Sequence, residues 1–464
     1  MKQKIEQLIH ATRLAFLSST FDKSRFYDLT LSLVAWKVFS TQTAKTGWNY
    51  NIDVVSPGAA YDFDRVMRHI GEPDHKERAS RSLQAWEAAN QATLAELIAV
   101  EPDLIQGIPQ SAWNLICVSW TDLFATQQSE NITLKALMVS VMDGLELSLS
   151  DDRIIFENYA PQELVGLMVD LLSSSPGSSL YDPYAWSGSF LSAAAQHLRG
   201  LSHIRGFAAA GLPWKLAKLR LLLLSTTAEL RIEKGLDHYK LSDEARFDLI
   251  LMNPPYGRRE NSQAVSTEPG PWSHLAGSSN RIDLALVCHS LNRLSPTGSA
   301  AILLPGIFLS GQGALLEFRC RVIQNNLLDA VITLPSGVFP QTGVSTNILV
   351  FNKKRATDKV FMLDASHLVQ KSINQVVLDE AAIHRYLIRY REGTLTPDEH
   401  CLLVSNNHIT KMGHDLKFST YVPSEQQLIN PFPSSVSLFE ESSRLFAEYQ
   451  QTQEKIKQLT QSKK

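Results

Sequence analysis

Cysteine is scarce in this chain. Its 464 residues include four cysteines, and no two of them form a Cys-x-x-Cys pair. Zinc sites and disulfide frameworks usually show such patterned spacing, so neither is predicted. The thirteen histidines make no His-x-x-x-His pair with a carboxylate partner, and we predict no metal site. Free, buried thiols are expected at Cys117, Cys288, Cys320 and Cys401.

Long apolar runs are also missing. No run reaches the roughly 20 residues that a membrane-spanning helix needs. Residues 1–6 open a polar helix without the apolar centre of a secretion signal. We therefore expect a cytoplasmic protein without a membrane partner. With 44% hydrophobic and 20% charged residues, the composition is typical of a globular chain of two or three domains.

The chain also lacks an excess of positive charge. Lysine and arginine together number 44 against 47 acidic residues, which gives a net charge of -3. A protein that holds DNA alone usually neutralises the phosphates with a basic surface. If this chain works on nucleic acid, we expect a partner to supply much of the grip.

What is present begins with a helical region, residues 1–150. Apolar residues recur at near-helical spacing from Ile5 to Leu17, and residues 26–36 have the pattern of a buried helix with aromatic bulk. Further helices are predicted around residues 77–99 and 133–147. No strand alternation persists, so we predict an all-α N-terminal domain.

An α/β organisation follows from about residue 151. Pro161 stands at the start of a predicted helix that reaches Leu172, and short apolar strands then alternate with helices as far as residue 354. This alternation predicts a doubly wound, mostly parallel sheet, which binds its ligands at the carboxyl ends of its strands. The expected strands are Leu180–Pro183, Ile204–Ala208, Leu230–Glu233, Phe247–Met252, Ser299–Leu304, Leu328–Leu334 and Asn347–Phe351.

The predicted boundaries divide the rest of the chain into three parts. Residues 151–356 form the α/β domain, 357–430 a mixed extension of it, and 431–464 a C-terminal helix. Phe439, Phe446, Tyr449 and Ile456 occupy heptad-like a and d positions in that helix. It packs either on a partner or on its own chain.

The strongest motif is Asn253-Pro254-Pro255-Tyr256, at the end of the fourth predicted strand. An exocyclic or amide nitrogen is a weak nucleophile because its lone pair is delocalised, so an enzyme has to hold both N–H groups. The Asn253 side-chain oxygen and the Pro254 carbonyl offer two acceptors on stiff backbone, and Tyr256 offers a flat face for a flipped base. A simple turn is the alternative interpretation.

This motif resembles the catalytic motif of amino-group methyltransferases, and the longer pattern resembles the modification subunit of type I restriction-modification systems. Segments 159–172, 280–285, 298–305 and 327–353 carry the resemblance. It implies a class I S-adenosylmethionine-dependent fold with a seven-stranded sheet, and methylation of adenine N6 in double-stranded DNA. It also implies that the C-terminal helix meets a specificity subunit, with a second methyltransferase or a nuclease subunit as further partners.

The resemblance assigns catalysis to Asn253, Pro254, Pro255 and Tyr256. It assigns cofactor binding to Tyr159, Pro161, Asp182, Pro183, Ser187, Gly188, Asp237 and Asn253.

Two departures from the family pattern concern the same ligand. Trp186 replaces the first glycine of the cofactor loop, and Ser189 the last. Ala208 stands where the family carries an acidic residue for the ribose hydroxyls, and residues 198–228 contain no Asp or Glu. Losing a charged acceptor typically costs roughly 1.5–3 kcal/mol. Either an active enzyme binds S-adenosylmethionine in a rebuilt or weakened pocket, or a cofactor-deficient subunit holds DNA beside an active paralogue. Methylation of a protein glutamine or an RNA base is a third hypothesis.

Overall fold

The structure is a computed structural model that describes most of the chain. It describes residues 1–17, 25–41, 58–68, 70–90, 104–148, 159–173, 175, 177–224, 228–233, 245–259, 270–339, 345–371 and 376–422. The predicted C-terminal helix and Asp237 lie outside these ranges. No helix within them is long and apolar enough to cross a membrane.

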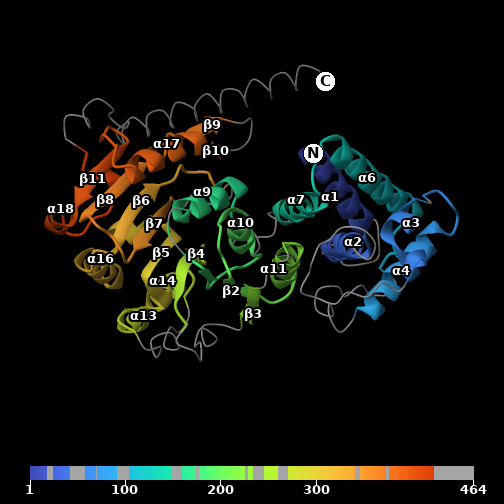
Figure 1. Cartoon of the computed structure of the whole chain (residues 1–464), viewed down its shortest axis with the longest axis horizontal. Helices are drawn as coiled ribbons and strands as arrows, with labels where there is room; N and C mark the ends of the chain where they lie inside the picture. The colour runs from blue at the N-terminus through green and yellow to red at the C-terminus, as the bar shows by residue number, and fades with distance from the viewer. Residues whose placement is uncertain are drawn as a thin grey trace, which may run out of the picture.

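The N-terminal part is a helical bundle, as its apolar pattern predicted (Figure 1). Four buried tryptophans, Trp36, Trp86, Trp113 and Trp120, fill its core. The described residues up to 148 include no strand. The helices are α1 (Lys2–Leu17), α2 (Phe26–Thr41), the 3₁₀ helix η2 (Ala59–Tyr61), α3 (Phe63–Met67), α4 (His75–Ala89), α6 (Gln110–Ser129) and α7 (Leu134–Ser148).

All seven expected strands form, each within a few residues of its predicted bounds except that β5 starts earlier. They are β1 (Ser179–Asp182), β2 (His203–Ala209), β3 (Ala228–Glu233), β4 (Phe247–Met252), β5 (Leu294–Pro305), β6 (Leu328–Thr333) and β7 (Thr346–Asn352). Two more strands, β8 (Lys359–Asp364) and β11 (Cys401–Ser405), extend the sheet.

Within the described residues the sheet therefore has nine strands, where the sequence predicted seven. Their order is β11-β8-β6-β7-β5-β4-β1-β2-β3. Pairing is parallel from β3 through β5 and between β6 and β8, while β7 and β11 run antiparallel to their neighbours. The two additional strands come from the extension after residue 356. A separate small hairpin consists of β9 (Val369–Lys371) and β10 (Val376–Leu378).

Helices cover both faces of the sheet, which explains why its strands read as continuous apolar runs. One face packs on α9 (Gln162–Leu172), α10 (Ser189–His197) and α17 (Glu380–Arg391). The other packs on α13 (Ser273–Gly277), α14 (Ile282–Arg293), α16 (Ala314–Gln324) and α18 (Asn406–Lys411). Two further short helices are α15 (Ile307–Ser310) and η4 (Phe418–Thr420).

Helix α11 (Leu212–Leu223) joins the bundle to the sheet, and it lies beside α7 in the middle of Figure 1. Its residues Leu216, Leu219 and Leu223 belong to the same core as the bundle. At the same interface Lys215 of α11 pairs with Asp28 of α2 at 2.7 Å. The bundle is thus packed directly on a helix that follows β2.

All four cysteines are free thiols. Cys117, Cys288 and Cys401 are buried as predicted, whereas Cys320 on α16 is only half-buried. The described residues contain no group of three or more His, Cys, Asp or Glu side chains arranged to hold a metal ion.

Candidate functional site

The site is built at one edge of the sheet. Strands β1, β2, β4 and β5 run parallel, so Asp182, Ala209 and Met252 end at the same edge. The predicted catalytic motif follows β4 directly, and the predicted cofactor loop follows β1. Because β1 and β4 are hydrogen-bonded neighbours, the fold brings the two motifs side by side.

The Asn253–Tyr256 segment is largely buried and held by its own side chains. Asn253 is 4% exposed. The Tyr256 hydroxyl donates a hydrogen bond of 2.7 Å to Asn253 Oδ1. Burial, and secondarily the charge of Asp283, raises the pKa of Tyr256 well above its ordinary value, so this hydroxyl keeps its proton. The sequence predicted Asn253 Oδ1 as an acceptor for a target amine, and in the structure this oxygen also accepts the hydrogen bond from Tyr256.

The far end of this segment is anchored to the start of α14. Gly257 donates its N–H to Asp283 Oδ2 at 3.4 Å, and Ile282 donates to the Arg258 carbonyl at 3.2 Å. Arg281 binds both oxygens of the buried Asp283, at 3.0 and 2.6 Å. In the sequence, segment 280–285 carries only the family resemblance, from which Arg281 and Asp283 receive no role. The structure assigns them to fixing the backbone that carries Asn253.

The predicted cofactor loop contains two residues with positive φ. Trp186 has φ 46° and Gly188 has φ 75°. At Gly188 an added Cβ would stand 2.8 Å from Ala217 Cβ and 2.9 Å from its Cα, so this glycine is required. For a tryptophan the left-handed region costs about 1–2 kcal/mol. Its ring is half-buried and stacks on Tyr184 with centroids 6.5 Å apart. Trp186 thus stands in the left-handed region that favours glycine, at the expense of backbone strain.

Asp182 is the most unusual group at this edge. It is fully buried, and its Oδ1 accepts one hydrogen bond from the Tyr184 N–H at 3.0 Å. Its Oδ2 has no hydrogen-bond partner among the described residues. Burial raises the pKa of this carboxyl well above the ordinary value. A buried acceptor without a partner is costly to folding and suits a ligand that brings a donor.

The remaining predicted cofactor residues are divided between two places. The Ser187 hydroxyl donates to Glu146 and accepts from Arg220, so it is already engaged within the protein and is not free to contact a ligand. Pro183 and Gly188 shape the loop. Ala208 is buried at the end of β2 and offers no side-chain acceptor. Asp237 lies outside the described residues.

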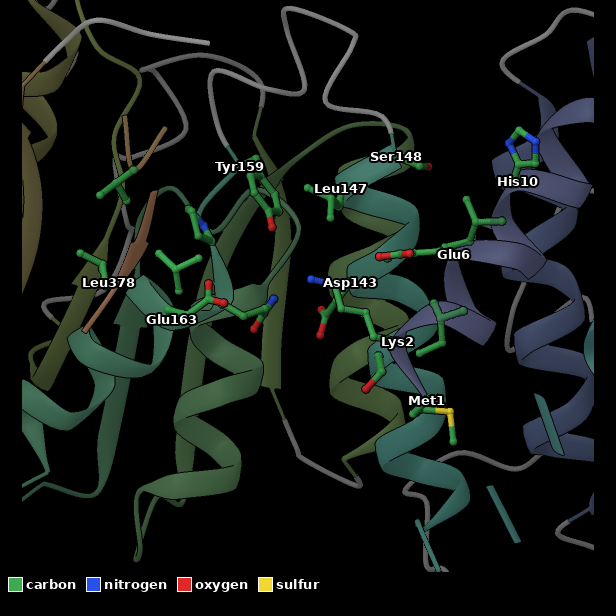
Figure 2. Close-up of a pocket in the computed structure, with 18 of the residues that line it drawn as sticks. Met1, Lys2, Glu6, His10, Asp143, Leu147, Ser148, Tyr159, Glu163 and Leu378 are labelled. Atoms are coloured by element: carbon green, nitrogen blue, oxygen red, sulfur yellow. The ribbon is translucent and has the colours of Figure 1, made fainter. Parts of the chain in front are cut away.

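Tyr159 and Pro161 line a separate cavity of about 870 Å³ between the bundle and the sheet (Figure 2). In the figure Tyr159 and Glu163 approach it from one side, and Asp143, Glu6 and Lys2 from the other. Asp182, Asn253 and Tyr256 do not line it. Burial, and then Glu146, Glu163 and Asp143, raises the pKa of Tyr159. The cavity adjoins the start of α9 and is not lined by the residues of the sheet edge.

The raised pKa of Asp182 predicts how the free energy of unfolding changes with pH when this residue is replaced. A carboxyl whose pKa is raised by folding stabilises the fold fully below its unfolded pKa, and that contribution is lost as pH rises through the folded pKa. The asparagine of Asp182→Asn does not titrate. The variant should therefore become more stable than the unsubstituted chain as the pH rises from the unfolded to the folded pKa of Asp182. At neutral pH we expect a gain of about 1–3 kcal/mol in the free energy of unfolding.

Urea unfolding from pH 4 to 8, without ligand, measures this difference. Asp248→Asn is the matched control of opposite sign. Burial acts to raise the pKa of Asp248, but hydrogen bonds from Ser178, Ser179 and Ser295 outweigh it and lower the pKa. That variant should therefore lose stability at neutral pH. An Asp182→Asn variant that is less stable than the unsubstituted chain throughout the range would contradict the account of Asp182.

The chain resembles known proteins over much of its length. Residues 156–428 match the family model described as N-6 DNA Methylase. The methylase subunit of the type I restriction enzyme EcoEI from Escherichia coli is 25% identical over 268 residues, 51% of this chain and 54% of that protein. The MpnII methylase subunit from Mycoplasma pneumoniae is 30% identical over 201 residues, 41% of this chain and 36% of that protein. The matches thus span about half, or less, of these relatives' lengths.

Solved structures show the same fold. The methyltransferase subunit of a type I restriction-modification system from Streptococcus thermophilus superposes with a TM-score of 0.63 at 21% identity, covering 91% of this chain and 100% of that chain. A modification subunit of a putative type I restriction enzyme from Vibrio vulnificus gives a TM-score of 0.60 at 15% identity, covering 88% and 93%. The bundle and the sheet together are therefore an arrangement found in other solved chains.

Proposed function

Because this chain belongs to the N-6 DNA methylase family, we propose that it transfers a methyl group from S-adenosylmethionine to N6 of a flipped adenine in double-stranded DNA. The observation that carries the proposal is the buried Asn253, held at the carboxyl end of β4 beside the loop after β1. In this proposal the chain is the modification subunit of a type I-like restriction-modification or phage-defence system.

The residues present fit the cofactor in part. The unpaired Asp182 Oδ2 is an acceptor for a hydroxyl or ammonium donor, and the loop from Pro183 to Gly188 keeps the shape that permits close approach. Ala208 supplies no acceptor at the end of β2. We therefore propose that S-adenosylmethionine binds here with reduced affinity. It supplies the methyl group when bound.

The protein's own contribution is to hold the adenine amine. Asn253 Oδ1 and the Pro254 carbonyl oxygen accept hydrogen bonds from the two N–H groups of the amine. These bonds draw the nitrogen towards tetrahedral geometry, so that its lone pair is no longer delocalised into the ring. The Tyr256 hydroxyl donates to Asn253 Oδ1 and so orients the Asn253 amide. The Tyr256 ring is partly buried against the core and gives the base an aromatic neighbour. The N6 proton leaves to solvent after transfer, so no general base is required at the outset.

Partners follow from the charge. With a net charge of -3, the chain lacks the basic excess of a protein that holds DNA alone. We propose that a specificity subunit supplies the grip, with a second methyltransferase subunit or a nuclease subunit as further partners. The matched family and relatives do not favour the cofactor-deficient alternative over an active enzyme.

The test is the identity of the methylated product. The protein is incubated with isotopically labelled S-adenosylmethionine, and with DNA, RNA and a glutamine-bearing protein in parallel, alone and with the product of a neighbouring specificity gene. Mass spectrometry should find label in N6-methyladenine of the DNA. Label in RNA or in glutamine, but not in DNA, would overturn the proposal.

A further inference from the structure

A closed ring of hydrogen bonds connects the helical bundle to the cofactor loop. Glu146 lies on α7 of the bundle, Arg220 on α11, and Ser187 in the loop. The Ser187 hydroxyl donates to Glu146 Oε1 at 2.6 Å, and Arg220 Nη2 donates to Glu146 Oε2 at 2.9 Å. Arg220 Nη1 closes the ring with bonds of 2.9 Å to both the Ser187 hydroxyl and the Ser187 carbonyl. Three segments far apart in the sequence thus share one network.

The network is removed from water. The Arg220 side chain is 0% exposed and that of Glu146 is 2% exposed. Asp143, one turn before Glu146, also accepts from Arg220 Nη2 at 2.6 Å. Burial alone would lower the pKa of Arg220, but Glu146 and Asp143 outweigh it and hold that pKa above its ordinary value. Removing Arg220 would leave Glu146 buried without its counter-charge, whereas removing Glu146 would leave Arg220 with Asp143 as its remaining carboxylate partner. In both cases the bonds that fix Ser187 relative to α7 are lost or weakened.

The ring acts on the most strained part of the loop. Ser187 lies between the two residues with positive φ, Trp186 and Gly188. A bulky residue keeps such a conformation only where surrounding contacts over-determine it. The Ser187 carbonyl and hydroxyl are both held by Arg220, and Arg220 is itself held by α7 of the bundle.

We propose that Glu146 and Arg220 are positioning residues for the cofactor loop, so that the N-terminal bundle completes the site that binds S-adenosylmethionine. The inference rests on the proposed function in taking this loop as the cofactor loop. Its consequence is that the shape of the loop depends on the bundle being docked against α11.

The test compares two substitutions at the same interface in the full-length protein. Glu146→Ala breaks the ring, whereas Lys215→Met breaks the ion pair between α11 and Asp28 and does not touch the loop. We expect Glu146→Ala to weaken S-adenosylmethionine binding about ten- to a hundredfold by calorimetry. Lys215→Met should leave the affinity unchanged, even where it lowers the melting temperature as much. Equal affinities for the two variants would overturn the proposal.

A rescue experiment separates positioning from general stability. Adding Trp186→Gly to Glu146→Ala removes the residue that needs the ring to hold its backbone, because glycine adopts positive φ without strain. Trp186→Gly should therefore raise the affinity more in the Glu146→Ala background than it does in the unsubstituted chain. Failure of the rescue would mean that Glu146 acts through the stability of the interface and not through the loop.

Hydrogen exchange gives a readout that needs no ligand. The Ala185 N–H is bonded to the Phe207 carbonyl at 2.8 Å, and the Gly188 N–H to the Ala185 carbonyl at 2.7 Å. Peptides covering 182–190 should exchange faster in Glu146→Ala and not in Lys215→Met. If the unsubstituted chain binds no S-adenosylmethionine, the proposed function fails, and this exchange difference still decides whether the ring holds the loop.

Discussion

Replacing Asn253 with alanine should slow methyl transfer about a hundred- to a thousandfold, in line with the loss of one fixed hydrogen-bonding group at a reacting centre. In the proposed mechanism the amide oxygen of Asn253 is one of the two acceptors for the adenine amine, and its loss would leave the nitrogen lone pair delocalised. Affinity for S-adenosylmethionine should stay nearly the same, because Asp182 and the loop after β1 are untouched. Single-turnover rates and calorimetry measure the two effects separately.

The matched control is Asn352→Ala. Asn352 ends β7, which runs antiparallel to β5, so it lies at the opposite edge of the same sheet. It should retain full activity. An Asn253→Ala variant that keeps most of its activity would show that the amine is held elsewhere, and one that loses cofactor binding to the same degree as activity would place Asn253 in the cofactor site alone.

Restoring the two family residues should have the second large effect. Trp186→Gly removes the strain of a tryptophan at φ 46°, and Ala208→Glu returns a charged acceptor to the end of β2. Together they should tighten S-adenosylmethionine binding about ten- to a hundredfold, since a charged hydrogen bond contributes about 1.5–3 kcal/mol. Calorimetric titration of the double variant against the unsubstituted chain measures the gain.

The single variants separate strain from hydrogen bonding, and a carboxylate at the wrong position controls for charge. Ala210 lies just after β2 and is exposed, whereas Ala208 is buried within the end of the strand. Ala210→Glu therefore adds the same charge at a different position. It should bring no gain. If Trp186→Gly with Ala208→Glu binds no more tightly than the unsubstituted chain, the cofactor pocket has been placed wrongly.

The central sheet was predictable because its strands are buried on both faces. Runs such as Phe247–Met252 are apolar throughout, and turns rich in glycine, serine and proline separate them. The last two strands were not predicted. β11 is an edge strand of five residues that pairs with β8 about forty positions earlier, so no local pattern marks it. Helix α6 was not predicted as a separate helix. Its apolar residues Leu115 and Val118 are about half exposed, so the apolar positions do not form one clear face.

The site was predictable where a motif lies at the end of a strand. Asn253 and Asp182 were located from sequence because parallel strands end at one edge, while their roles stay predictions. The ring of Glu146, Arg220 and Ser187 could not be predicted, since its members are contributed by the bundle, α11 and the loop. The feature of the sequence that points to this ring is a charged residue within each of two apolar helices. Arg220 stands among leucines in α11, and Glu146 between Leu145 and Leu147.

Titration of S-adenosylmethionine into the protein, alone and with a co-purified partner, tests the central claim most directly. The account predicts saturable binding that Asp182→Asn weakens strongly, because Asp182 Oδ2 is a buried oxygen at the start of the loop that has no hydrogen-bond partner among the described residues. Asn253→Ala should bind nearly as well as the unsubstituted chain. No binding at millimolar cofactor, with or without the partner, would contradict the account of this chain as a DNA methylase.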